Sequence, residues 1–185
     1  GIKPAAETIP KARESLQRTL QLNPELSGAY SSLALIQFLI DRNWPESEQS
    51  LKRAIELNQN NADAFLRYGY FLTNLGRFDE GIEKLEAARE MNPISGIIQA
   101  DIGIAHLFAR RYPEAIDHFE KTAAENPKFS LPHWLSGIAH EALGDNEKSF
   151  ASNMTAIAID YETEGGKLSR KLLAIREQEG VEAAN

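Results

Sequence analysis

The side chains best suited to acid–base or metal chemistry are four histidines, His106, His118, His133 and His140. His133 and His140 are seven residues apart, so on a helix they would share a face but lie two turns from each other. A helical metal site requires tighter spacing, such as i and i+4, with carboxylates nearby. We therefore expect core or edge histidines with ordinary hydrogen bonds, and no bound metal.

Nucleophilic catalysis would need an activated side chain, a base and a donor for the oxyanion. Ser136 and His140 are four residues apart and could meet on a helix, but an uninterrupted helix has no free backbone amide for the oxyanion. The absence of cysteine excludes a thiol nucleophile, a thiolate zinc site and a disulfide. Gly165-Gly166 lacks the strand and the lysine of a phosphate-binding loop. The sequence therefore predicts a protein that is not an enzyme and binds no cofactor.

Charge and hydropathy narrow the classes of partner. The formal net charge is -7 without a long run of Lys and Arg, whereas a nucleic-acid binder would carry a basic face. The longest apolar stretch, residues 33–40, is interrupted by Gln37 and is far shorter than a membrane span. We expect this segment to bind neither nucleic acid nor membrane, and we expect a cytoplasmic protein. The chain begins at Gly1 without a methionine, which suggests an excerpt of a longer protein.

A period of 34 residues runs through most of the chain. Five series of positions keep this step: Gly69, Gly103 and Gly137; Ala54, Ala88, Thr122 and Ala156; Asn58, Asn92, Asn126 and Asp160; Leu51, Leu85, Phe119 and Asn153; and Trp44, Phe78 and Tyr112. Such a period is typical of a repeat fold in which each unit stacks on its neighbours. Leu16 lies 35 residues before Leu51, which indicates one inserted residue, and we expect it in the turn at 41–44.

Each period contains two amphipathic segments, which we name helix A and helix B. In the second full unit, apolar spacing predicts helix A over 62–75 and helix B over 78–91. Gly76 suits the position just past the end of helix A, and Asn92-Pro93 ends helix B. The glycine on helix A and the small residue late in helix B would let the two helices approach closely.

These residues resemble the tetratricopeptide-repeat consensus of a large residue, Leu-Gly, Tyr, Ala, an aromatic residue, Ala and Pro. The residues that carry the resemblance in the second unit are Phe65, Tyr68-Gly69, Leu72, Gly81, Leu85, Ala88 and Pro93. The resemblance implies an all-α fold, a right-handed α-superhelix (α-solenoid) of stacked antiparallel helix pairs. We expect an array over 1–163, with a half-unit at 8–26 and units at 27–61, 62–95, 96–129 and 130–163. Residues 164–185 are expected to form either a capping helix or a truncated fifth unit.

In this family the A helices line a concave groove that receives a partner. The family's groove positions carry over to largely apolar residues: Leu35, Phe38, Leu66, Tyr70, Asn74, Ile97, Ile104, Leu107, Phe108, Leu131, Trp134 and Ile138. The resemblance therefore implies a protein–protein interaction scaffold whose groove binds a peptide, either an amphipathic helix or an extended apolar segment. Packing of the same residues against a neighbouring unit, or against a second copy in a homo-oligomer, is the competing interpretation.

A narrower resemblance is to the repeat domains of bacterial regulators. It is carried by residues 43–46, 53–58 and 76–80. In such proteins the array follows a DNA-binding, cyclase or kinase domain. The alternative function is therefore a regulatory or homo-oligomerisation module of a larger bacterial signalling or transcription protein.

Overall fold

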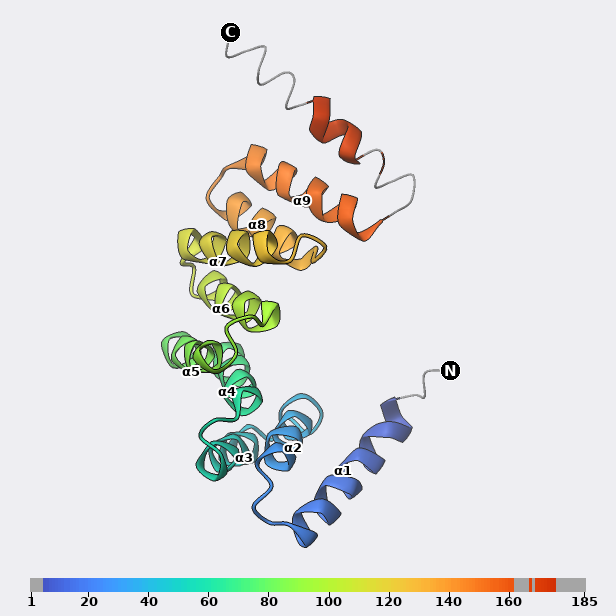
Figure 1. Cartoon of the computed structure of the whole chain (residues 1–185), viewed down its shortest axis with the longest axis vertical. Helices are drawn as coiled ribbons and strands as arrows, with labels where there is room; N and C mark the ends of the chain where they lie inside the picture. Colours follow the sequence, from blue (N-terminus) through green and yellow to red (C-terminus); the bar gives the residue numbers. More distant parts are fainter. Residues whose placement is uncertain (1–4, 162–166, 168, 176–185) are drawn as a thin grey trace. The chain divides into compact units, whose positions relative to one another are not determined.

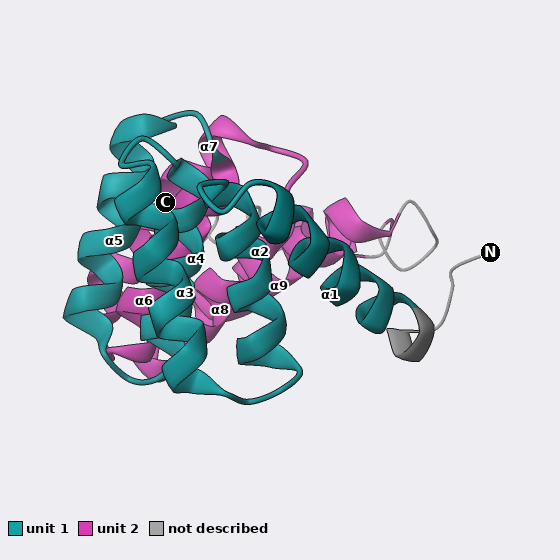
Figure 2. Ribbon diagram, turned by 90° about the horizontal axis from the view of Figure 1, so that it is seen from below, with its two compact units in different colours: residues 1–95 teal, residues 96–185 magenta. Residues whose placement is uncertain are grey.

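The computed structural model describes residues 5–161, 167 and 169–175, and all regular structure among these residues is α-helical. The chain divides into two compact units, residues 1–95 and 96–185 (Figure 2). Within each unit, successive helices form antiparallel pairs of the A and B type (Figure 1). The prediction of an all-α fold built of antiparallel helix pairs is therefore confirmed.

Unit 1 contains two complete helix pairs and one preceding helix. Its helices are α1 (Ala5–Leu22), α2 (Ser27–Leu39), α3 (Trp44–Leu57), α4 (Ala62–Asn74) and α5 (Phe78–Met91). α2 pairs with α3, α4 pairs with α5, and α1 packs on α2. Among the described residues of this unit, every helix–helix contact joins helices one or two places apart along the chain.

Unit 2 contains two further pairs. Its helices are α6 (Gly96–Phe108), α7 (Tyr112–Glu125), α8 (Leu131–Ala142) and α9 (Asn146–Asp160), and residues 169–175 are also helical. Arg170 Nη1 donates a hydrogen bond to the carbonyl oxygen of Ala158, 2.8 Å away, near the end of α9. Whether 164–185 is a cap or a truncated unit stays a prediction, because 162–166, 168 and 176–185 lie outside the described residues.

Local sequence signals explain where the helices begin. The side chains of Asn43, Asn61 and Asp145 precede α3, α4 and α9, and each accepts a hydrogen bond from a backbone N–H three residues later, at 3.4, 3.2 and 3.1 Å. Such N-caps satisfy amides that have no partner inside the helix. The expected bounds 62–75 and 78–91 agree with α4 and α5 to within one residue.

The turn between helix A and helix B keeps the same backbone conformation from pair to pair, although its residues differ. Arg42, Gly76, Arg110 and Gly144 are spaced by 34 residues, and all four adopt positive φ angles, of 54°, 77°, 60° and 79°. Glycine adopts this conformation without a steric cost, whereas arginine does not. The left-handed turn is therefore kept even where glycine is absent.

The first of these turns is one residue longer than the others. The Asn43 N–H donates to the carbonyl oxygen of Gln37, six residues earlier, at 2.9 Å. The corresponding Arg77 N–H donates to Leu72, five residues earlier, also at 2.9 Å. The insertion predicted at 41–44 is confirmed, and it lies just before Arg42.

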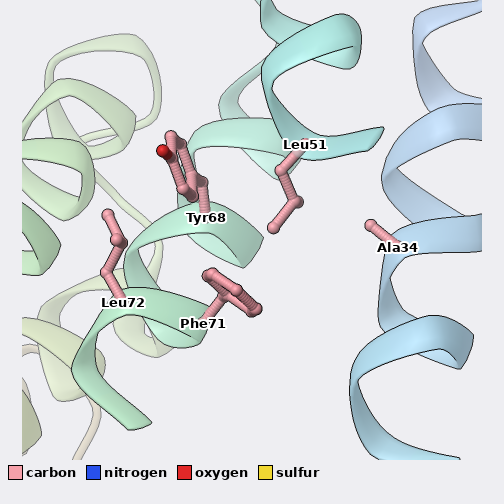
Figure 3. Close-up of a cluster of buried hydrophobic side chains, with 5 residues drawn as sticks. All are labelled: Ala34, Leu51, Tyr68, Phe71 and Leu72. Atoms are coloured by element: carbon pink, nitrogen blue, oxygen red, sulfur yellow. The ribbon is translucent and has the colours of Figure 1, made fainter. Parts of the chain in front are cut away.

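A glycine on helix A opposite a large residue on helix B holds each of the two central pairs together. A Cβ atom added to Gly69 would collide with Leu85, and one added to Gly103 would collide with Phe119. Leu85 and Phe119 are completely buried as a result. We name these two contacts the core locks. In unit 1, a further cluster joins the first two pairs: Ala34 of α2, Leu51 of α3, and Tyr68, Phe71 and Leu72 of α4 (Figure 3).

A polar cluster around Glu48 also joins the first two pairs of unit 1. The carboxylate of Glu48 on α3 accepts hydrogen bonds from Tyr68 Oη at 2.8 Å and Arg77 Nη1 at 3.0 Å, and Lys52 Nζ lies 3.0 Å away. Burial alone would raise the pKa of Glu48, but hydrogen bonds from Lys52, Tyr68 and Arg77 outweigh it and lower that pKa to about 2. The ionised carboxylate is thus part of the folded structure.

Candidate interaction surfaces

The A helices of unit 1, α2 and α4, pack against each other and carry five of the predicted site residues. We name these five residues the unit 1 face: Leu35, Phe38, Leu66, Tyr70 and Asn74. Leu35, Phe38 and Leu66 are half-buried, whereas Tyr70 and Asn74 are exposed. Only part of the predicted set in this unit is therefore accessible to a partner.

Aromatic packing accounts for the burial of Phe38. Its ring lies edge-on to Phe71, with centroids 5.2 Å apart and an interplanar angle of 70°, and to Tyr70, at 6.0 Å and 84°. Edge-to-face pairs contribute about 0.5–1.5 kcal/mol beyond their area burial. Phe38 thus serves the core, and Tyr70 is the aromatic ring that the unit 1 face exposes.

Polar side chains beside the unit 1 face satisfy one another. The Ser31 hydroxyl donates to Asp63 Oδ2 at 2.9 Å, and Arg67 Nε donates to the same oxygen at 2.7 Å. Ser31 is completely buried, so this contact ties the start of α4 to α2. The negative charge of Asp63 is balanced inside unit 1.

The A helices of unit 2, α6 and α8, also pack against each other and expose more apolar surface. We name six predicted residues on them the unit 2 face: Ile97, Ile104, Phe108, Leu131, Trp134 and Ile138. Ile97, Phe108 and Ile138 are 62%, 52% and 52% exposed. Leu131 is also exposed, and Ile104 and Trp134 are half-buried. Several exposed apolar residues on two helices that pack together mark a binding surface more often than single ones do.

Leu107, the seventh predicted residue in this unit, belongs to the core instead. It is only 8% exposed and packs with Ala115, Phe119 and Ala139. Adjacent helical residues point about 100° apart, and here Phe108 is 52% exposed while its neighbour Leu107 packs into the core. The prediction that Leu107 lines the partner groove is therefore wrong.

Trp134 is held in place by the helix that follows. Its indole N–H donates to Asp160 Oδ2 at 3.0 Å. Hydrogen bonds from the side chains of Ser130 and Trp134 lower the pKa of Asp160. Because the polar atom of the indole is engaged inside the unit, Trp134 offers a partner part of its ring only.

Asp101 on α6 was not among the predicted site residues. It shares a side of the helix with Ile97, Ile104 and Phe108, because the four follow the spacing i, i+4, i+7 and i+11. Asp101 is half-buried, and its carboxylate has no hydrogen bond or ion pair within the described part of the chain. Burial raises the pKa of Asp101 to about 6. The spacing was visible in the sequence, but the groove positions carried over from the family omit this residue.

A separate cavity of about 860 Å³ lies along α2 and α3. Its lining is mainly polar, and its charged side chains include the pairs Lys52–Glu48, at 3.0 Å, and Arg53–Glu56, at 3.2 Å. None of the predicted site residues lines it. Because these charges already pair with one another, the cavity is a weaker candidate for binding than the unit 2 face.

The histidines occupy structural positions. His106 and His118 stack between α6 and α7, with ring centroids 5.4 Å apart and an interplanar angle of 16°. His140 is buried, and burial lowers the pKa of His133. Among the residues that the structure describes, no three His, Cys, Asp or Glu side chains form a group that could hold a metal ion. Within the same residues, no helix is long and apolar enough to cross a membrane.

Curated relatives match most of this chain at low identity. It is 24% identical over 152 residues to anaphase-promoting complex subunit 3 of Schizosaccharomyces pombe, which covers 81% of this chain and 23% of that protein. It is also 24% identical over 118 residues to the type IV pilus assembly protein PilF of Pseudomonas aeruginosa, which covers 63% of this chain and 46% of that protein. The chain thus spans less than half the length of either relative.

Solved structures share the fold. A crystal structure of MamA has a TM-score of 0.70 at 19% identity and covers 82% of this chain and 88% of that one. A crystal structure of YrrB, described as a TPR protein with an unusual peptide-binding site, has a TM-score of 0.67 at 17% identity and covers 90% of this chain and 86% of that one. At such identities the likeness shows the fold alone.

Family models identify the repeat itself. One model of the tetratricopeptide repeat matches residues 50–83 and another matches residues 100–159. The first match runs from α3 into α5, and the second runs from α6 into α9, so both cover helix pairs of the type described above. The chain belongs to the tetratricopeptide-repeat family.

Proposed function

We propose that this repeat array is a protein–protein interaction scaffold and that its unit 2 face binds a peptide or a helix of the partner. The observation that carries the proposal is the exposure of Ile97, Phe108 and Ile138 on two adjacent helices. Covering apolar surface contributes roughly 25 cal/mol per Å², so a partner that covers these side chains gains affinity from them. Membership of the tetratricopeptide-repeat family supports an interaction role.

The unit 1 face contributes differently. Tyr70 is exposed and rests against Phe38, so it presents a rigid ring with a hydroxyl group. Such rings are favoured at protein interfaces because they bury a large area with little loss of conformational freedom. We therefore infer that the unit 1 face offers a partner less apolar area than the unit 2 face does.

A display selection tests the proposal directly. A phage library of random short peptides is panned against the purified chain, and the affinity of the best peptide is measured by fluorescence anisotropy. Ile138→Ser should weaken binding about tenfold, because it removes an apolar contact within the face. Ile94→Ser is the matched control, since Ile94 is 87% exposed in the loop before α6 and lies outside the face. Equal losses in the two variants, or no selected peptide, would contradict the proposal.

Light scattering addresses the alternative of homo-oligomerisation. A wild-type monomer over a wide concentration range leaves the unit 2 face available to a different protein. A dimer that Ile138→Ser converts to a monomer would mean that a second copy covers the face. The array would then act as an oligomerisation module, and the scaffold proposal would fail.

A further inference from the structure

The carboxylate of Asp101 interrupts an otherwise apolar side of α6. Ile97 and Phe108, toward the two ends of this stripe, are more than half exposed, and Ile104 lies one turn from Asp101. Asp101 itself is half-buried. The stripe therefore combines apolar surface with one negative charge in its middle.

In the part of the chain that the structure describes, the charge of Asp101 is not paired, unlike the charge of the residue at the same position in the preceding repeat. Arg67 lies 34 residues earlier, on α4, and donates to Asp63 at 2.7 Å. Asp101 has no such partner within the described residues. A partly desolvated carboxylate without a partner is unfavourable, and the pKa of Asp101, raised to about 6 by burial, reflects this. At neutral pH the group is still mostly ionised, so the face carries an unbalanced negative charge.

We propose that Asp101 receives an arginine of the partner, so that the segment bound on the unit 2 face carries one arginine among apolar side chains. This inference rests on the proposed function. Arginine fits better than lysine, because its planar guanidinium can pair with both carboxylate oxygens and is more weakly hydrated than an ammonium group. An acidic side chain at this point would bring two like charges together in partly apolar surroundings.

In this arrangement the apolar side chains provide affinity, whereas the ion pair at Asp101 sets the register of the bound segment. The apolar side chains of the unit 2 face can contact many apolar segments, and by themselves they discriminate weakly among them. A single ion pair at Asp101 fixes which residue of the segment lies at the middle of α6, and it disfavours segments that place an acidic residue there. The net charge of -7 also favours the approach of a basic partner.

The test is a set of parallel display selections against four proteins: wild type, Asp101→Asn, Asp101→Lys and the control Asp117→Asn. Asp117 lies on α7, pairs with Lys121 at 2.6 Å and allows the same substitution away from the face. Wild type and the control should select apolar peptides with arginine enriched at one position. Asp101→Asn should still select apolar peptides but lose that enrichment, and Asp101→Lys should replace arginine by an acidic residue there.

A double-mutant cycle uses the affinities of the best peptide that the wild-type protein selects. Replacing its arginine by glutamine, or Asp101 by asparagine, should each weaken binding about tenfold, and the two changes together should weaken it little further. Losses that simply multiply would overturn the assignment of arginine to Asp101. Apolar peptides without arginine would overturn this inference but leave the proposed function standing. A failure of all four proteins to select peptides, or a dimer that Ile138→Ser dissolves, would overturn both.

Discussion

The two units are built from helix pairs of the same type, but the side chains on their A helices are packed and paired differently. In unit 1, Phe38 packs on Phe71, and Asp63 accepts hydrogen bonds from Ser31 and Arg67. In unit 2, Phe108 and Ile138 are more than half exposed, and Asp101 has no partner within the described residues. The unit 1 face is mostly packed and the charge beside it is paired, whereas the unit 2 face exposes more apolar surface and one unbalanced charge.

The comparison distinguishes contacts that both units keep from surface residues that differ between them. The core locks Gly69–Leu85 and Gly103–Phe119 occur in both units, and both large residues are fully buried. The A-helix faces vary although this contact is kept in one helix pair of each unit. We infer that the core locks hold the repeat together and that the faces are free to serve binding.

The largest expected effect concerns the feature that the units share. Leu85→Ala in unit 1 and Phe119→Ala in unit 2 should each lower the free energy of unfolding by about 3 kcal/mol, because each leaves a cavity opposite a glycine. Urea denaturation followed by circular dichroism measures both costs. A loss below about 1 kcal/mol in one unit would mean that the two core locks are not equivalent.

The next effect should distinguish the two faces. Phe38→Ala should cost about 2 kcal/mol of stability, since its ring is packed on Phe71, whereas Phe108→Ala should cost less than about 0.5 kcal/mol. The order should reverse for affinity toward the selected peptide, where Phe108 matters more. Equal stability losses in the two variants would remove the contrast between an internal and an exposed face.

Acid should weaken unit 1 through Glu48. Its folded pKa, about 2, lies below the ordinary value of 4.5, so the folded state favours the ionised form. The resulting stabilisation, on the order of 2 kcal/mol, is fully present above pH 4.5 and is lost as the pH falls toward 2. Wild type and Glu48→Gln should therefore differ in unfolding free energy at neutral pH and converge on acidification. A difference that stays constant with pH would contradict the role of Glu48.

The smallest expected effect comes from Asp101, and here stability changes with pH in the opposite direction to that of Glu48. Its pKa is higher in the folded state, about 6, than the ordinary 3.8, so the folded state binds the proton more tightly. Wild-type stability should therefore fall as the pH rises from 3.8 to 6. Asp101→Asn should be more stable than wild type by about 1 kcal/mol at neutral pH and lose this advantage in acid. Calorimetry at several pH values, with Asp117→Asn as control, measures the difference.

The repeat period predicted the fold well, because it fixes helix length, turn position and the buried stripe together. The observed α4 and α5 lie within one residue of the ranges inferred from Gly76, Asn92 and Pro93. The faces were harder to predict. Whether Leu107 or Phe108 points outward depends on the rotation of α6 about its axis, which is set by the side chains that pack against it. Asp101 was missed because groove positions were taken from the family rather than from spacing along α6.

The local pattern of helix contacts has a consequence for how the chain folds. Within each unit, the described helices touch only helices one or two places away along the sequence. Forming these contacts requires the closure of short loops, so little chain entropy is lost before packing begins to stabilise the structure. Helical proteins of this kind fold in roughly microseconds to milliseconds. Folding can therefore begin within one part of the array and spread from pair to neighbouring pair.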